Sequence, residues 1–404
     1  MKTQLQLSLD QAWQQIREQL FRSDTGLCYD YISEFLPFST EIALGFPNPC
    51  GWGTGMEDCA LNGGFLLDIL RLRGELGTLF AAEIERGLVR LGTVHGVSGF
   101  VARGISPRDG KSCYSNSSRD QFTLAVYGLY RVLKHGSLGE DARKLLRDVA
   151  EYCERTVTPK NGFAFSRLDG GKAIVSKMWE NAPHEALRLP MIYGIAYEAT
   201  GEERFRELCV RYAIPGLKRT MSLDAEASWW DIPLIQMQLS LCYFAESEIV
   251  PDADWRGVMR LVSQIGCREL KKLLGEVECY RGRWNVPCGD WRILPMRIVP
   301  ETLSEQGAVF DEKVYLNPCF NREFAQPNAF LRGIGNYLGS IALGSEVPLS
   351  LVEQVAKILA PLDLCNCTGA GTVSLTHGLS LTLQQDILTK ESRKKELQLQ
   401  GEKV

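Results

Sequence analysis

The sequence predicts an all-α protein folded as an (α/α)6 toroid, in which six helical hairpins close into a ring. Three observations predict this fold. Helical segments that lack a polar face alternate with amphipathic helical segments. The alternation recurs six times along the chain. No Gly-, Pro- or Ser-rich linker divides the 404 residues, so a single toroid domain is expected over 1–390, followed by a charged tail at 391–404.

The six segments expected to face the interior are rich in apolar and small residues on all sides. They lie near 56–73, 118–135, 184–199, 229–245, 323–343 and 371–388. An amphipathic segment follows each of the first five, and the N-terminal helix near 9–20 is expected to be the outer partner of the sixth. One hairpin cannot bury its inner face alone, so stacked hairpins would form one core. An open α-solenoid is the alternative, but the repeats are irregular and no polar capping repeat is evident.

Composition narrows the class of protein. The net charge is −4 and no segment is strongly basic, which argues against nucleic acid as the main partner. No apolar run approaches the length of a membrane span. The first twenty residues predict an amphipathic helix and not a signal peptide. A cytoplasmic protein is expected, or a periplasmic or secreted one if a leader has been removed, and the oligomeric state is left open.

Cysteine and histidine usage predicts neither disulfides nor a metal site. Most of the thirteen cysteines lie within apolar runs, as buried reduced thiols do. Cys365 and Cys367 are two positions apart, which is not a zinc-ligand spacing. The four histidines are not paired at ligand spacing either. No metal and no cofactor are therefore expected.

The inner helices of a toroid run parallel, so their polar first turns should meet at one mouth. The loops that enter these helices are long, at about 96–117, 158–183 and 279–322, whereas the reverse connections are short. Turn residues between alternating runs predict β-hairpins over 96–114 and 161–179. Long loops on one face of a rigid scaffold usually carry function, so the mouth is the expected site.

Three stretches are similar to the hairpin starts and turns of the six-hairpin glycosidases. They are "GTGMEDCALNGG" at 53–64, "NSSRDQ" at 116–121 and "YEATGEERF" at 197–205. The chain thus resembles a superfamily that includes the unsaturated glucuronyl and rhamnogalacturonyl hydrolases. The resemblance implies a sugar cleft at the mouth and acid/base work by acidic residues of inner-helix starts. Unsaturated uronyl hydrolases use two aspartates from successive hairpins, and Asp58 and Asp120 match them by position.

These acids also make chemical sense on their own. Hydrolysis of a glycosidic bond needs a carboxylic acid that protonates the leaving oxygen and a second carboxylate that acts as base or nucleophile. The sequence predicts Asp120 as the general acid and Asp58 as its partner, with Glu57 as a further catalytic candidate. The alternative is that each acid only caps a helix, since carboxylates are common at helix N-termini.

Residues around these acids are predicted to bind the sugar. Flat aromatic rings can stack on sugar C–H faces, while polar side chains bind the hydroxyls or an acidic group. The arginines could equally pair with neighbouring acids. The predicted substrate-binding residues are Trp52, Arg119, Gln121, Trp179, His184, Arg188, Trp229, Trp230 and Asp231.

The sequence therefore predicts a glycoside hydrolase acting on a glycan or oligosaccharide, with acidic and unsaturated sugars among the candidate substrates. Two other functions stay open. A polysaccharide lyase on the same fold could use His184 with Tyr114 or Tyr193 as base. A non-catalytic carbohydrate-binding protein would need the tryptophans but not the acids. Sugar epimerases of this fold rely on paired histidines, which the scattered histidines do not supply.

Overall fold

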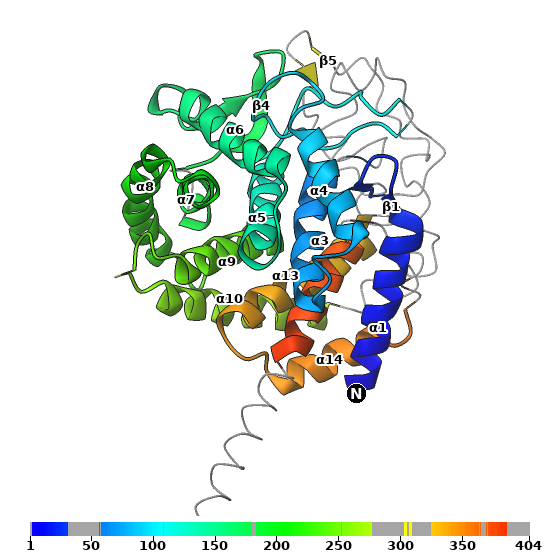
Figure 1. Ribbon diagram of the computed structural model, residues 1–404. Helices are drawn as coiled ribbons and strands as arrows, with labels where there is room; N and C mark the ends of the chain where they lie inside the picture. The colour runs from blue at the N-terminus through cyan, green and yellow to red at the C-terminus, as the bar shows by residue number, and fades with distance from the viewer. Residues whose placement is uncertain are drawn as a thin grey trace, which may run out of the picture.

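The computed structural model describes residues 2–30, 56, 58–107, 109–179, 183–251, 253–276, 303–304, 307–308, 325–362, 364, 369 and 371–385. Within these residues the chain is predominantly α-helical, with three two-stranded antiparallel hairpins. Figure 1 shows α1, α8, α10 and α14 toward the edge of the view and α3, α5, α9 and α13 nearer the middle.

The helices that correspond to the predicted inner segments are largely buried. They are α3 (Cys59–Arg73), α5 (Arg119–His135), α7 (Arg188–Thr200), α9 (Asp231–Glu246), α13 (Ala325–Gly344) and the helical residues 371–385. The third begins four residues later than predicted, after the 3-10 turn η3 (Pro183–Glu185). Pro190 then lies in the first turn of α7, the part of a helix in which a missing N–H costs least.

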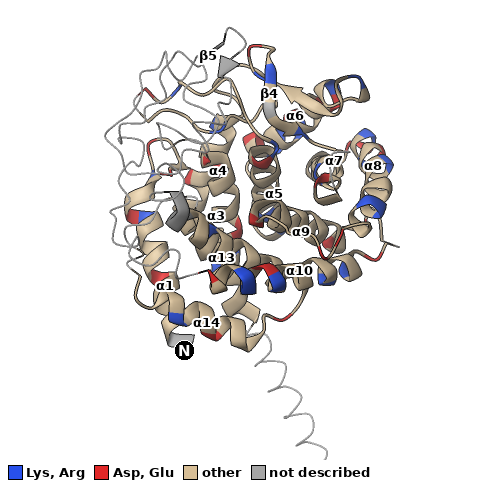
Figure 2. Cartoon of the chain, turned by 180° about the vertical axis from the view of Figure 1, so that it is seen from behind, with Lys and Arg blue, Asp and Glu red and all other residues tan. Residues whose placement is uncertain are grey.

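The intervening helices carry one apolar stripe each. They are α1 (Lys2–Gln15), α4 (Leu79–Leu91), α6 (Glu140–Thr156), α8 (Glu203–Met221), α10 (Trp255–Gly275) and α14 (Leu349–Leu359). A short π-helical turn, η1 (Ile16–Leu20), continues α1. Figure 2 shows many of the Lys, Arg, Asp and Glu residues on α8 and α10. Their charged faces are solvated while their apolar stripes cover the buried helices.

Helices α3 and α5 pack in parallel and at very short range. Gly64 of α3 lies against the backbone of Leu124, and further along both helices Asp68 pairs with Arg131. Because residue numbers rise together on the two helices, their N-termini lie at the same end. Gly128 also faces Gly64, and the absence of side chains at this crossing allows the backbones to meet.

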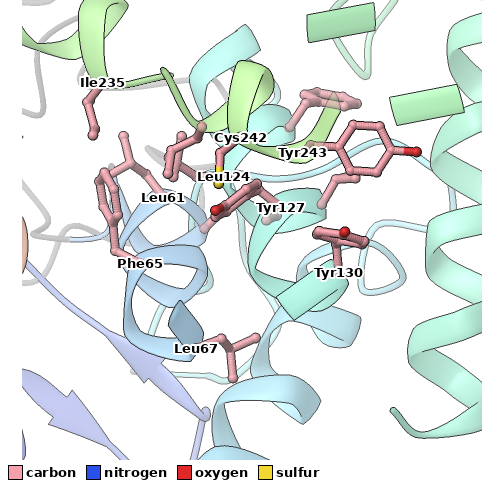
Figure 3. Close-up of a cluster of buried hydrophobic side chains, with 14 of the residues drawn as sticks. Leu61, Phe65, Leu67, Leu124, Tyr127, Tyr130, Ile235, Cys242 and Tyr243 are labelled. Carbon is pink, nitrogen blue, oxygen red and sulfur yellow. The ribbon is translucent and has the colours of Figure 1, made fainter. Parts of the chain in front are cut away.

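Helices α7 and α9 also pack in parallel. Near the helix starts, Arg188 donates to Gln236, and one to two turns later Gly194 packs against the ring of Tyr243. Tyr243 in turn meets Tyr130 of α5 edge to face, with ring centroids 5.0 Å apart. Figure 3 shows these tyrosines inside the buried cluster that α3, α5 and α9 share. The core therefore continues from one helix to the next.

Two further contacts extend this series. At the start of α9, Asp231 pairs with Arg332 of α13, and Gly335 of α13 lies against the backbone of the 371–385 helix. His377 of that last helix lies 2.8 Å from Asp68 of α3. A helix near the end of the described chain thus packs on the first long buried helix.

The strands are short. They form the hairpins β1 (Phe21–Arg22) with β2 (Leu27–Cys28), β3 (Ala164–Ser166) with β4 (Lys172–Lys177), and β5 (Leu303–Ser304) with β6 (Gly307–Ala308). The predicted hairpin over 161–179 is present as β3 and β4. The hairpin predicted over 96–114 is not formed by the described residues there, which make a single antiparallel bridge between Ile105 and Cys113. The β1–β2 hairpin was not predicted, since its strands are too short to show an alternating pattern.

Two further properties concern the described residues alone. None of their helices combines the length and hydrophobicity that crossing a bilayer requires. The cysteines among them form no disulfide with one another. Five are buried and two are partly buried: Cys28, Cys59, Cys153, Cys209 and Cys242, then Cys113 and Cys267. Burial raises the pKa of the Cys153, Cys209 and Cys242 thiols to about 12, so these thiols stay protonated at neutral pH.

Candidate functional site

The first turns of α3 and α5 are joined by a fully buried glutamine. Gln121 accepts a hydrogen bond from the Leu61 backbone N–H at 2.9 Å and donates to Oδ1 of Asp58 at 2.8 Å. Helix N-termini leave backbone N–H groups without intrahelical partners, and Gln121 satisfies one of them across the helix interface. The predicted residues Asp58 and Gln121 are therefore brought together.

Asp58 occupies the N-cap position of α3, but its side chain makes no capping hydrogen bond. Its Oδ1 instead faces Gln121 and, at 3.4 Å, Nη1 of Arg103. The side chain is 33% exposed. Helix capping, the alternative explanation for this acid, does not account for where the carboxylate lies.

Asp120 lies in the first turn of α5, where its Oδ1 is 2.9 Å from Nη1 of Arg188. Arg188 is only 1% exposed, whereas the side chain of Asp120 is 21% exposed. Burial by itself would raise the pKa of Asp120, but the charges of Arg188 and Arg119 outweigh it and hold the pKa below its usual value. Asp120 is therefore a carboxylate at neutral pH.

A second ion pair lies beside the first. Arg119 contacts the buried carboxylate of Glu185, and Nε2 of His184 lies 3.3 Å from the same group. Burial of Glu185 favours its neutral form, but the neighbouring His184 and the charge of Arg119 lower its pKa below the usual value. The imidazole of His184 also meets the ring of Trp229 edge to face, with centroids 5.2 Å apart. His184 and Arg119 are thus fixed by Glu185.

Asp231 is held at the start of α9. Its carboxylate receives two hydrogen bonds from Arg332, at 2.8 and 3.2 Å, and one from Asn336 at 2.8 Å. The side chain is nearly buried. A bidentate pair of this kind joins α9 to α13, so the structure assigns Asp231 a clear role in packing.

The predicted tryptophans differ in exposure. Trp230 is 78% exposed, and Trp229 is partly buried with its Nε1 donating to the backbone of Asp224. Trp179 is buried, and its ring packs against Phe163 and Tyr212. Trp230 therefore offers a large ring surface to solvent. The remaining predictions, Trp52 and the catalytic candidate Glu57, lie outside the described residues.

Sequence reasoning missed several polar residues of this region. Arg103 comes from the loop between α4 and α5, and Glu185 from the 3-10 turn before α7. Gln236 and Arg332 lie more than one turn into α9 and α13. The sequence-based prediction considered polar and charged residues in the first turns of the buried helices, so it did not single these residues out. It did place the long loop at 96–117, which contains Arg103, at the expected site.

Two other features of the described residues bear on the location of a site. No group of three or more His, Cys, Asp or Glu side chains among them is arranged to hold a metal ion. A cavity of about 540 Å³ lies at the opposite ends of α3 and α5, where Arg71, Glu85 and His135 contribute to its lining. We place the candidate site at the helix N-termini all the same, because partly exposed carboxylates with charged partners gather there.

Comparisons with known proteins assign no family. No protein-family model matches the sequence, and neither a curated protein nor a solved structure is significantly similar to the chain.

Proposed function

We propose that the described helices belong to one (α/α)6 toroid and that its helix N-termini form the active site of a glycoside hydrolase. A series of pairwise contacts supports the toroid. It runs from α3 through α5, α7, α9 and α13 to the 371–385 helix, which returns to α3 through Asp68 and His377. The hydrolase rests on one observation: two partly exposed carboxylates, Asp58 and Asp120, lie at adjacent helix starts without capping them.

The two acids take roles opposite to those that the sequence suggested. Asp120 is held ionised by Arg188, which suits a base or nucleophile and not a general acid. Asp58, whose contact with Arg103 is longer at 3.4 Å, is then assigned as the proton donor. In the proposed reaction Asp58 protonates the glycosidic oxygen as the C–O bond breaks. Asp120 takes the proton of the water that attacks the anomeric carbon, or attacks that carbon itself.

The environments of the candidate tyrosine and histidine bases favour a hydrolase over a lyase. A lyase would need an accessible Tyr or His base. Tyr193 is buried against Tyr212, and its pKa is raised by burial, so its phenol neither reaches solvent nor ionises easily. Tyr114 is buried as well. His184 is partly exposed but is engaged by Glu185.

The binding alternative rests on Trp230, whose exposed ring could stack on a sugar without any catalysis. Such a protein would have no use for a carboxylate pair with these partners. In the hydrolase, Trp230 at the start of α9 supplies a stacking platform for the sugar, and the substrate is a glycan with no metal or cofactor required. Arg119 and Arg188, already paired with acids, position the site.

The experiment is a screen of uncharged and uronate-containing oligosaccharides, each with a saturated or an unsaturated terminal ring. A hydrolase releases new reducing ends and incorporates heavy oxygen from labelled water, whereas a lyase creates an ultraviolet-absorbing double bond. On the substrate found, we expect Asp120→Asn and Asp58→Asn each to lower turnover by about 10² or more. Their effects should not add, because the pair acts as a unit.

Asp141→Asn is the matched control, since Asp141 lies in the first turn of α6 and is exposed. It should keep full activity. Each variant is assayed well below its own melting temperature, because Arg188 loses a charged partner in Asp120→Asn. Full turnover by folded Asp120→Asn, or sugar binding with no cleavage of any glycan, would contradict the hydrolase.

A further inference from the structure

Gln121 has a different environment from a substrate-binding side chain. It is fully buried, and both ends of its amide are engaged within the protein. Its oxygen accepts from the backbone N–H of Leu61, which can only donate. Its nitrogen must therefore point to Asp58, because reversing the amide would set two donors against each other.

This orientation has a consequence for Asp58. The Gln121 amide nitrogen can only donate, so Oδ1 of Asp58 must accept whether or not the carboxyl carries a proton. Arg103, the second donor, lies near the same oxygen at 3.4 Å. Within the described part of the chain, Oδ2 of Asp58 has no hydrogen-bond partner. Among the described residues, Asp30 also lies beside Asp58 and accepts a hydrogen bond from its backbone N–H at 3.2 Å.

We propose that Gln121 is a positioning residue that holds the catalytic proton of Asp58 on Oδ2. The proposal rests on the proposed hydrolase and defines how its acid works. Oδ2–H of Asp58 gives its proton to the leaving oxygen as the C–O bond breaks, and Oδ1 stays bonded to Gln121 throughout. The proton that Asp120 removes from water returns to solvent, and Asp58 is reprotonated from solvent.

Gln121 also joins the two carboxylates mechanically. It follows Asp120 directly on α5 and reaches the first turn of α3. Any change in the amide therefore alters the position of Asp58 relative to Asp120. Since misplacement of a reacting group by about 1 Å can cost about 10²-fold in rate, the amide should be important for turnover and not for affinity.

The first test needs no substrate. In ¹⁵N-labelled full-length protein, the side-chain amide signal of Gln121 is assigned by its loss in Gln121→Met. We expect this signal to move with pH in the wild type and to stop moving in Asp58→Asn. The side-chain amide of Gln238 bonds a backbone oxygen and serves as the control. A Gln121 signal that titrates identically in Asp58→Asn would overturn the contact on which the proposal depends.

The second test uses the oligosaccharide that the wild-type protein cleaves. Gln121→Glu keeps an acceptor for Leu61 and the side-chain size, but sets a second carboxyl against Asp58. We expect kcat to fall about 10²-fold with KM little changed, and the pH profile of kcat to shift. A rise in KM with kcat and its pH profile unchanged would instead make Gln121 a substrate ligand and refute the positioning role. If no glycan is cleaved, the proposed function fails, and the amide titration still decides whether Gln121 senses Asp58.

Discussion

Nε2 of His377 lies 2.8 Å from Oδ2 of Asp68, although the two residues are 309 positions apart in the chain. Both side chains are buried. The same carboxylate also meets Arg71 at 2.6 Å and Arg131 at 3.2 Å. Burial alone would favour the neutral acid, but these partners hold the pKa of Asp68 well below its usual range. One anion thus holds three helices together.

Removing this anion should be costly. In Asp68→Ala the buried Arg131 loses the partner nearest its Nε, and loss of one member of a buried pair typically costs about 3–5 kcal/mol. We expect the free energy of unfolding, measured by urea denaturation, to fall by about that amount. Glu203→Gln, which breaks an exposed pair with Arg206 on α8, should cost at most about 1 kcal/mol. Equal losses in the two variants would show that the Asp68 cluster does not stabilise the fold.

Acid should destabilise the protein through Asp68 and also through two acids of the candidate site. The folded-state pKa values of Asp120 and Glu185 are lowered, so the unfolded chain binds more protons than the folded one in acid. Their stabilisation is complete above the unfolded pKa of about 4 and is lost as pH falls through the folded values. The melting temperature should therefore fall steeply below about pH 4.

Asp120→Asn provides the comparison for this pH dependence, because it removes one titrating group and keeps the side-chain shape. Its stability at neutral pH should be lower than that of the wild type, and its decline with acid should be shallower. A decline as steep as in the wild type would mean that Asp120 does not stay ionised through its contact with Arg188.

The fold was more predictable than the site. Apolar residues on all sides of a helix are a local signal, so the buried helices were found within a few residues. Charged first turns are local too, which is why the sequence could point to Asp58, Asp120 and Arg188 as candidates. Pairing is not local: Arg188 turns toward Asp120, and Arg103 comes from a loop. These contacts depend on how helices approach, which a single sequence does not encode in any short pattern.

The charge state of Asp120 could not be predicted from the sequence. Its place at a helix start indicated a functional acid but carried no information about its charge state. A buried guanidinium beside the carboxyl decides that state, and Arg188 lies 68 positions away in the chain. The N-terminus of α5 also depends on a distant contact, since Ser118 at its N-cap makes no side-chain capping bond and the Ser117 hydroxyl donates to the backbone of Val101.

Helices α3 and α5 cross most closely where Gly64 lies against the backbone of Leu124. A Cβ at Gly64 would collide with the backbone carbonyl of Leu124, which cannot rotate away as a side chain could. Gly64→Ala should therefore push the helices apart and lower the free energy of unfolding by about 1–3 kcal/mol or more. Because Gln121 spans the same interface to Asp58, the Gln121 side-chain amide signal should shift as well.

Gly77→Ala is the matched control. Gly77 lies in the turn between α3 and α4, and a Cβ there would meet nothing within 4 Å. Its stability should be unchanged or raised by up to about 1 kcal/mol, because alanine restricts the unfolded chain. If Gly64→Ala were as stable as Gly77→Ala, the backbones of α3 and α5 could not be as close as described. The bridge from Gln121 to Asp58 would then lack the packing that holds it in register.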